Sequence, residues 1–146
     1  MSGLTLNDAS RIAQTAHSAA QEGGIAPLCV TVLDAGGHVL VTMRDQRASL
    51  YRPDIAAAKA AGCLGMGFGG REIVRRAAAM PTFYSAVATI TGGGVVPVAG
   101  GVLIRDASGA LLGAVGISGD TSDNDELCAI AGIQAAGLVA DTGAVT

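Results

Sequence analysis

The fold of this chain is decided first by the stretch Val32-Leu33-Asp34-Ala35-Gly36-Gly37-His38-Val39-Leu40. Apolar and β-branched residues flank a turn of small residues, which is typical of two strands joined by a tight turn. Extended outward, the pattern predicts strands over Cys29–Asp34 and His38–Arg44. The sequence therefore predicts a β-hairpin near the N-terminus.

A second stretch is Gly113-Ala114-Val115-Gly116-Ile117-Ser118-Gly119-Asp120-Thr121-Ser122-Asp123-Asn124-Asp125-Glu126. It predicts a strand that runs into a helix capped by Thr121 or Ser122, with acidic residues in the first turn. Together with Gly101–Asp106, the segment Leu111–Ser118 predicts a second hairpin. The last helix is expected to end near Asp141–Gly143.

The remaining segments predict helices. Thr5 is the expected N-cap of a first helix, Asp8 lies in its first turn, and Gly23-Gly24 end it. Further along, the patterns predict a helix over Pro53–Leu64, a short helix over Arg71–Met80, an ambiguous segment over Pro81–Thr89, and a glycine-rich loop entering a strand over Ile90–Pro97. Two hairpins with helices set between them favour an α+β fold in which helices cover an antiparallel sheet.

The composition limits the kind of protein. A chain of 146 residues fits a single domain over 1–146. Half of the residues are apolar and only 3% are aromatic, so small side chains dominate the core, which favours a homo-oligomer, at least a dimer. A net charge of −3, with one lysine and eight arginines, gives no case for nucleic acid or a membrane surface. No apolar run is long enough to span a membrane.

The N-terminus and the cysteines bear on localisation. Met1–Thr5 lacks the basic and apolar pattern of a signal peptide, which predicts a cytoplasmic protein. The cysteines, Cys29, Cys63 and Cys128, are far apart and odd in number, so they are expected to be buried thiols in a reducing compartment.

Four motifs, in order, resemble the GlcG/HbpS family of small heme- and corrinoid-associated domains. They are Asp34–His38, Asp54–Ala61, Gly92–Pro97 and Gly113–Gly119, and the resemblance runs from about Leu4 to Gly137. It implies a profilin-like, five-stranded antiparallel sheet flanked by helices, assembly into dimers up to octamers, and a ligand such as heme. Family members also accompany catabolic operons, which implies an accessory role there.

The two histidines are candidate site residues. His17 borders the apolar stripe of the first helix, where an imidazole can reach a heme iron from a crevice. The resemblance makes His17 the candidate for the metal ligand, because a first-helix histidine ligates heme in some family members. His38 follows the hairpin turn close to Asp34, which suits a base or a metal ligand, or simply a solvent-facing turn residue.

Several other residues are candidates for binding or catalysis. Arg71 and Arg75 share one helix face, and their guanidinium groups suit carboxylates. Lys59, if buried, can act as a base or nucleophile. The glycines Gly92, Gly93 and Gly94 can present backbone N–H groups to an anion. Each also has an ordinary structural interpretation, as a solvated helix face, a snorkelling lysine or a flexible turn.

Two functions follow. The first is a protein that binds heme or a related tetrapyrrole. The alternative is a small cofactor-independent enzyme acting on a carboxylate-bearing metabolite, with His38 and Lys59 transferring protons. We expect one pocket at the sheet edge, lined by His38, the Gly92–Gly94 loop and at least one of Arg71, Arg75 and Lys59.

Overall fold

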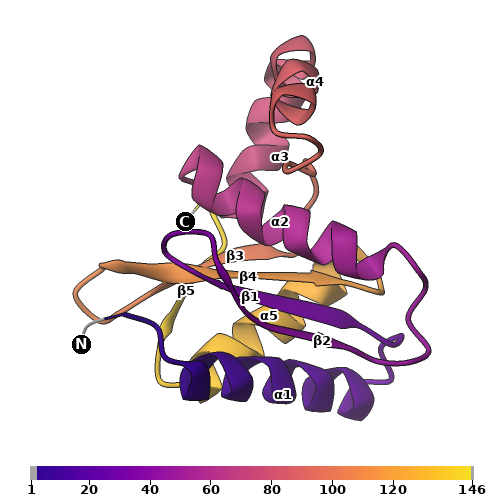
Figure 1. Cartoon of the computed structure of the whole chain (residues 1–146), viewed down its shortest axis with the longest axis vertical. Coiled ribbons are helices and arrows are strands. Elements are labelled where there is room, and N and C mark those ends of the chain that lie inside the picture. Colours follow the sequence, from indigo (N-terminus) through magenta and orange to yellow (C-terminus); the bar gives the residue numbers. More distant parts are fainter. Residues whose placement is uncertain (1–2, 146) are drawn as a thin grey trace.

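A computed structural model describes residues 3–145 and shows one five-stranded antiparallel sheet (Figure 1). The predicted domain span of 1–146 also includes Met1, Ser2 and Thr146, which lie outside the described residues. The strands run in the order β2-β1-β4-β3-β5. Their bounds are β1 Cys29–Asp34, β2 Val39–Arg44, β3 Gly101–Arg105, β4 Leu111–Ser118 and β5 Val139–Asp141. Both predicted hairpins are therefore confirmed, and β1 pairs with β4 to join them.

Helices cover both faces of the sheet (Figure 1). The helices α1 and α5 lie on one face, while α2 lies on the other and leads into α3 and α4, which extend away from the sheet. The bounds are α1 Leu6–Glu22, α2 Arg52–Met66, α3 Gly70–Ala79, α4 Pro81–Ile90 and α5 Ser122–Ala135. This arrangement confirms the α+β fold class. Within the described residues, no helix combines the length and apolar character needed to cross a membrane.

Local sequence signals explain the ends of these elements. Thr5 caps α1 through a capping box with Asp8, and Thr121 caps α5 by accepting a hydrogen bond from the Asn124 amide. In the β1–β2 turn, the Asp34 carboxylate accepts hydrogen bonds from the amides of Gly36 and His38. The acidic and hydroxyl residues of the turns therefore act through their own backbone neighbours.

Small residues allow α2 to pack directly on the centre of the sheet. A Cβ at Gly116 of β4 would overlap the carbonyl oxygen of Ala56 on α2. The helix backbone therefore approaches the strand more closely than any larger side chain at this position permits. The apolar core is divided by the sheet into one cluster under α1 and α5 and another under α2 and α3.

Two sequence expectations were wrong. The segment Ile90–Pro97 does not enter a strand: α4 extends to Ile90, and a loop continues until β3 begins at Gly101. The last helix ends at Ala135 rather than near Asp141, because Gly137 adopts a left-handed conformation with φ of 74°. The following residues then form β5, which pairs with β3 at the sheet edge.

Candidate functional site

His17 lies on α1 with its imidazole directed at the end of β2. Its Nε2 atom is 2.8 Å from the carbonyl oxygen of Met43, and because a carbonyl only accepts, Nε2 must carry the hydrogen. In the neutral ring, Nδ1 then holds a lone pair, and no described residue donates a hydrogen bond to it. Histidines that ligate metals commonly have this arrangement, with the second ring nitrogen donating to a carbonyl.

A hollow of about 140 Å³ opens beside His17. Polar groups make up most of its exposed lining, and they include the ion pair of Asp45 and Arg47. The hollow is lined by His17, Ala20, Gln21, Ile25, Ala26, Pro27, Leu28, Asp45 and Arg47. It combines an oriented imidazole, a guanidinium and a few apolar side chains within one depression.

The Asp45–Arg47 pair is bidentate. Arg47 donates from Nε to Oδ1 of Asp45 at 3.1 Å and from Nη2 to Oδ2 at 3.0 Å. These hydrogen bonds lower the pKa of Asp45 to about 2. Most of the Arg47 side chain is still exposed at the rim of the hollow, so its remaining N–H groups face solvent.

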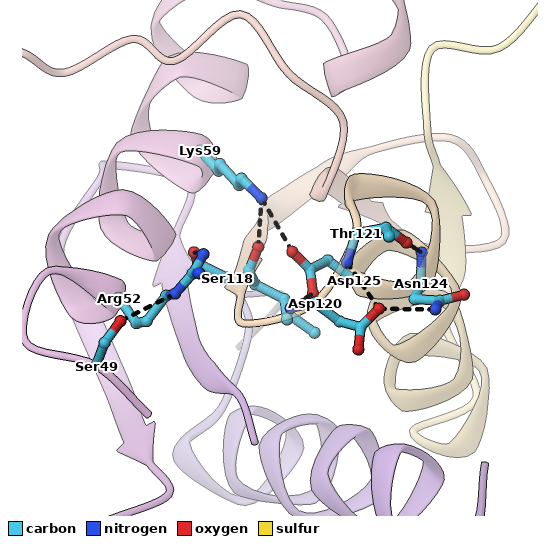
Figure 2. Close-up of polar contacts among 9 residues, drawn as sticks. Ser49, Arg52, Lys59, Ser118, Asp120, Thr121, Asn124 and Asp125 are labelled. Atoms are coloured by element: carbon cyan, nitrogen blue, oxygen red, sulfur yellow. Dashed lines mark hydrogen bonds and ion pairs between the residues drawn. The ribbon is translucent and has the colours of Figure 1, made fainter. Parts of the chain in front are cut away.

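Lys59 is buried in an ion pair (Figure 2). Its Nζ lies 2.8 Å from the carbonyl oxygen of Ile117 and 3.2 Å from Oδ2 of Asp125. Burial lowers the pKa of Lys59 and raises that of Asp125, while their mutual attraction opposes both shifts. In this arrangement Lys59 ties α2 to the end of β4 and the start of α5.

His38 lies on the β1–β2 turn, where most of its side chain is exposed. Its Nδ1 is 3.3 Å from Oδ1 of Asp34. Asp34 pairs with Gly113, four residues along β4 from the Ile117 carbonyl that Lys59 contacts. At ~3.3 Å per residue, the two ends are roughly 13 Å apart, so the structure does not bring His38 and Lys59 together.

The two candidate arginines are held in ion pairs. Arg71 of α3 contacts Glu126 at 2.8 Å and Asp123 at 2.6 Å, which raises its pKa. Arg75 pairs with Glu72 and donates a hydrogen bond to the carbonyl oxygen of Gly143. Both arginines fasten α3 to neighbouring segments, α5 in one case and the C-terminal segment in the other.

The glycines Gly92, Gly93 and Gly94 line a different hollow, of about 290 Å³, over α2. Gly92 and Gly93 have φ values of 66° and 86°, which glycine adopts without strain. The other lining residues are Asp54, Ala57, Ala58, Ala61 and Thr91. None of the candidate histidines, arginines or Lys59 lines this hollow, so the expected convergence in one pocket is absent from it.

Sequence reasoning missed the partners that define each site. The Met43 carbonyl and Asp125 were not identified as site groups, since hydrogen bonds across 26 or 66 positions leave no local sequence signal. The Asp45–Arg47 pair was also missed, although its residues are only two positions apart. The three cysteines are buried and free, as predicted. Among the described residues, no group of three or more histidines, cysteines or carboxylates is placed to hold a metal ion.

Comparisons with known proteins agree on one family. The family model "Haem degrading protein HbpS-like" matches residues 4–134. The crystal structure of a PduOC:heme complex is 27% identical, with a TM-score of 0.83 over 97% of this chain and 99% of that chain. The crystal structure of HbpS is 31% identical, with a TM-score of 0.79 over 92% and 90%.

A third structure, the Klebsiella pneumoniae protein ORFY, is 25% identical, with a TM-score of 0.82 over 92% of this chain and 90% of that chain. Curated proteins give no match. The structural similarity extends over nearly the whole length of each relative, so the fold and the family resemblance concern the whole domain.

Proposed function

We propose that this chain, which belongs to the HbpS-like family, binds heme or a related tetrapyrrole at the hollow beside His17. Family membership and the relative solved as a heme complex support the class of ligand. The observation that carries the site is the His17–Met43 hydrogen bond, which leaves the Nδ1 lone pair available.

The residues of the hollow fit such a ligand. The half-buried Ile25 offers apolar surface to a macrocycle, His17 offers a ring nitrogen, and Arg47 offers N–H donors to a carboxylate. A bound heme supplies an iron that accepts a nitrogen lone pair. At about 140 Å³ the hollow is below the ~300–1,000 Å³ of pockets that enclose a ligand, so it would hold only part of a macrocycle.

His17 has two tasks in this proposal. Its Nε2–H is held by the Met43 carbonyl, so the ring keeps one orientation, and Nδ1 faces the ligand as a metal ligand. Arg47 would donate to a carboxylate of the bound group, while Asp45 holds the guanidinium in place.

Titration with hemin, followed by the Soret band, tests the proposal. We expect His17→Ala to shift the Soret maximum and weaken binding, since the nitrogen ligand is lost. His38→Ala is the matched control, because the second histidine of the chain lies outside the hollow. Equal spectra and affinities for the wild type and His17→Ala would refute the assignment of His17.

We also propose that a second copy of the chain covers α4. This helix has no charged residue, packs on α3 rather than on the sheet, and leaves Phe83 53% and Ile90 82% exposed. Exposed apolar surface of this kind is typical of an interface, and the small apolar core gives a further reason for self-association. Sedimentation velocity should show a dimer or larger, reduced to monomer by Phe83→Glu with Ile90→Glu. Leu127→Glu on α5, 59% exposed, is the control.

A further inference from the structure

Arg52, in the first turn of α2, has a positive charge that no carboxylate among the described residues neutralises. Its Nε donates to Oγ of Ser49 at 3.3 Å and its Nη1 donates to Oγ of Ser118 at 3.0 Å (Figure 2). Within residues 3–145, no carboxylate oxygen lies within 4.0 Å of its guanidinium. Among the described residues, Arg11 and Arg44 also lack a carboxylate partner, but both are exposed, whereas Arg52 is half-buried.

The two carboxylates drawn with Arg52 in Figure 2, Asp125 and Asp120, are already engaged. Oδ2 of Asp125 accepts from Lys59, and its Oδ1 accepts from the Asp120 amide. Asp120 in turn accepts from the amide of Ala26 and from the Asn124 side chain. Because every oxygen of the two carboxylates has a donor, neither can neutralise Arg52 without breaking a hydrogen bond.

Hydrogen-bond donors are in excess at this point. A guanidinium has five N–H groups, and Arg52 uses two of them on hydroxyl oxygens. Ser49 and Ser118 accept from Arg52, so each hydroxyl hydrogen is left to donate elsewhere. Ser118 is fully buried, and among the described residues its hydroxyl hydrogen has no acceptor. The cluster therefore lacks an acceptor group that carries negative charge.

We propose that Arg52 and Ser49 form a binding subsite for a carboxylate, and that the buried Ser118 hydroxyl holds the guanidinium in position. A planar carboxylate matches the fork of a guanidinium, and its single charge matches the one unpaired cation, since Lys59 is neutralised by Asp125. None of Arg52, Ser49 and Ser118 lines the His17 hollow, so the two sites have no residue in common. It does not depend on heme binding.

Titration of acetate, monitored by the ¹⁵N–¹H signals of the arginine side chains, tests the subsite, with chloride at equal ionic strength as the reference. We expect the Arg52 Nε signal to shift with saturation. Arg52→Gln should weaken acetate binding at least about tenfold, the effect of losing charge-assisted hydrogen bonds. Arg76→Gln on α3 should leave it unchanged, because Arg76 is paired with Glu72.

A second set of ligands identifies the source of the carboxylate. If protoporphyrin shifts the Arg52 signal and its dimethyl ester does not, the carboxylate is a tetrapyrrole side chain; if acetate shifts it, a small free carboxylate binds. Inorganic phosphate binding more tightly than acetate would overturn the assignment to carboxylates. If neither acetate nor protoporphyrin shifts the Arg52 signal, the proposal of a subsite is refuted.

Ser118→Ala should weaken acetate binding, as Arg52→Gln does. A His17→Ala protein that loses heme ligation yet keeps the acetate shift would separate this subsite from the proposed function.

Discussion

Replacing Lys59 with methionine should destabilise the protein strongly, because it leaves a buried carboxylate without its cation. The side chains of Lys59 and Asp125 are 4% and 1% exposed. After the change, Asp125 keeps only the Asp120 amide as a donor, and the Ile117 carbonyl loses the Lys59 ammonium. Breaking a buried pair at one partner costs ~3–5 kcal/mol. Total stabilities are ~5–15 kcal/mol, so this is a large fraction.

The double variant Lys59→Met with Asp125→Leu measures how strongly the two charged side chains depend on each other. Replacing both ions by apolar side chains removes the two desolvation costs together, so we expect the double variant to be more stable than the sum of the single changes predicts. Urea unfolding of the wild type, both single variants and the double variant gives the coupling free energy. Arg76→Met, at an exposed ion pair, is the control and should cost about 1 kcal/mol or less.

The pH dependence of the Lys59→Met variant gives a second check. Burial raises the pKa of Asp125, so this carboxyl group takes up a proton more readily in the folded state than in the unfolded state. A raised folded pKa contributes stability at low pH that is lost as the pH rises through that value. The cost of Lys59→Met should therefore be smaller at pH 5 than at pH 7. A loss under about 1 kcal/mol at pH 7, or strictly additive single variants, would refute this account of the buried pair.

Three other changes test the packing, the turn carboxylate and the thiols. Gly116→Ala on β4 should lower the free energy of unfolding in urea by more than about 3 kcal/mol, because its Cβ would overlap the α2 backbone. Gly65 lies on α2 with open space around it, so Gly65→Ala should stabilise the protein by ~0.5–1 kcal/mol. Comparable effects of the two changes would contradict the close packing. Hydrogen bonds lower the pKa of Asp120 to about 2, so its contribution to stability should be present above pH 4 and be lost as the pH drops towards 2. The stability of Asp120→Asn should lack that part of the acid dependence. An acid profile equal to that of the wild type would contradict this role of Asp120. Burial raises the pKa of Cys63 to about 12, so this thiol should resist alkylation at pH 8 until the protein is unfolded, and rapid labelling of the native protein would be inconsistent with its burial.

The sequence by itself determined the elements whose signals lie within a few residues. The Asp34 turn, the Thr5 and Thr121 caps and the glycine that ends α1 act through neighbouring backbone groups, so composition and order were enough to predict them. The two hairpins followed from these turns and from the alternation of their strands. Gly137 also ends a helix locally, although the sequence analysis expected that end near Asp141–Gly143.

Only the tertiary structure decided what depends on contacts between distant segments. The three residues of β5 form a strand because β3 offers an unpaired edge, and no local preference of Val139–Asp141 indicates that pairing. The candidate sites are of the same kind: His17 meets the Met43 carbonyl, Lys59 meets Asp125, and Arg52 meets Ser118. Each partner is brought by a different element, so which polar side chain is neutralised and which remains available for a ligand is fixed only when the helices close over the two faces of the sheet.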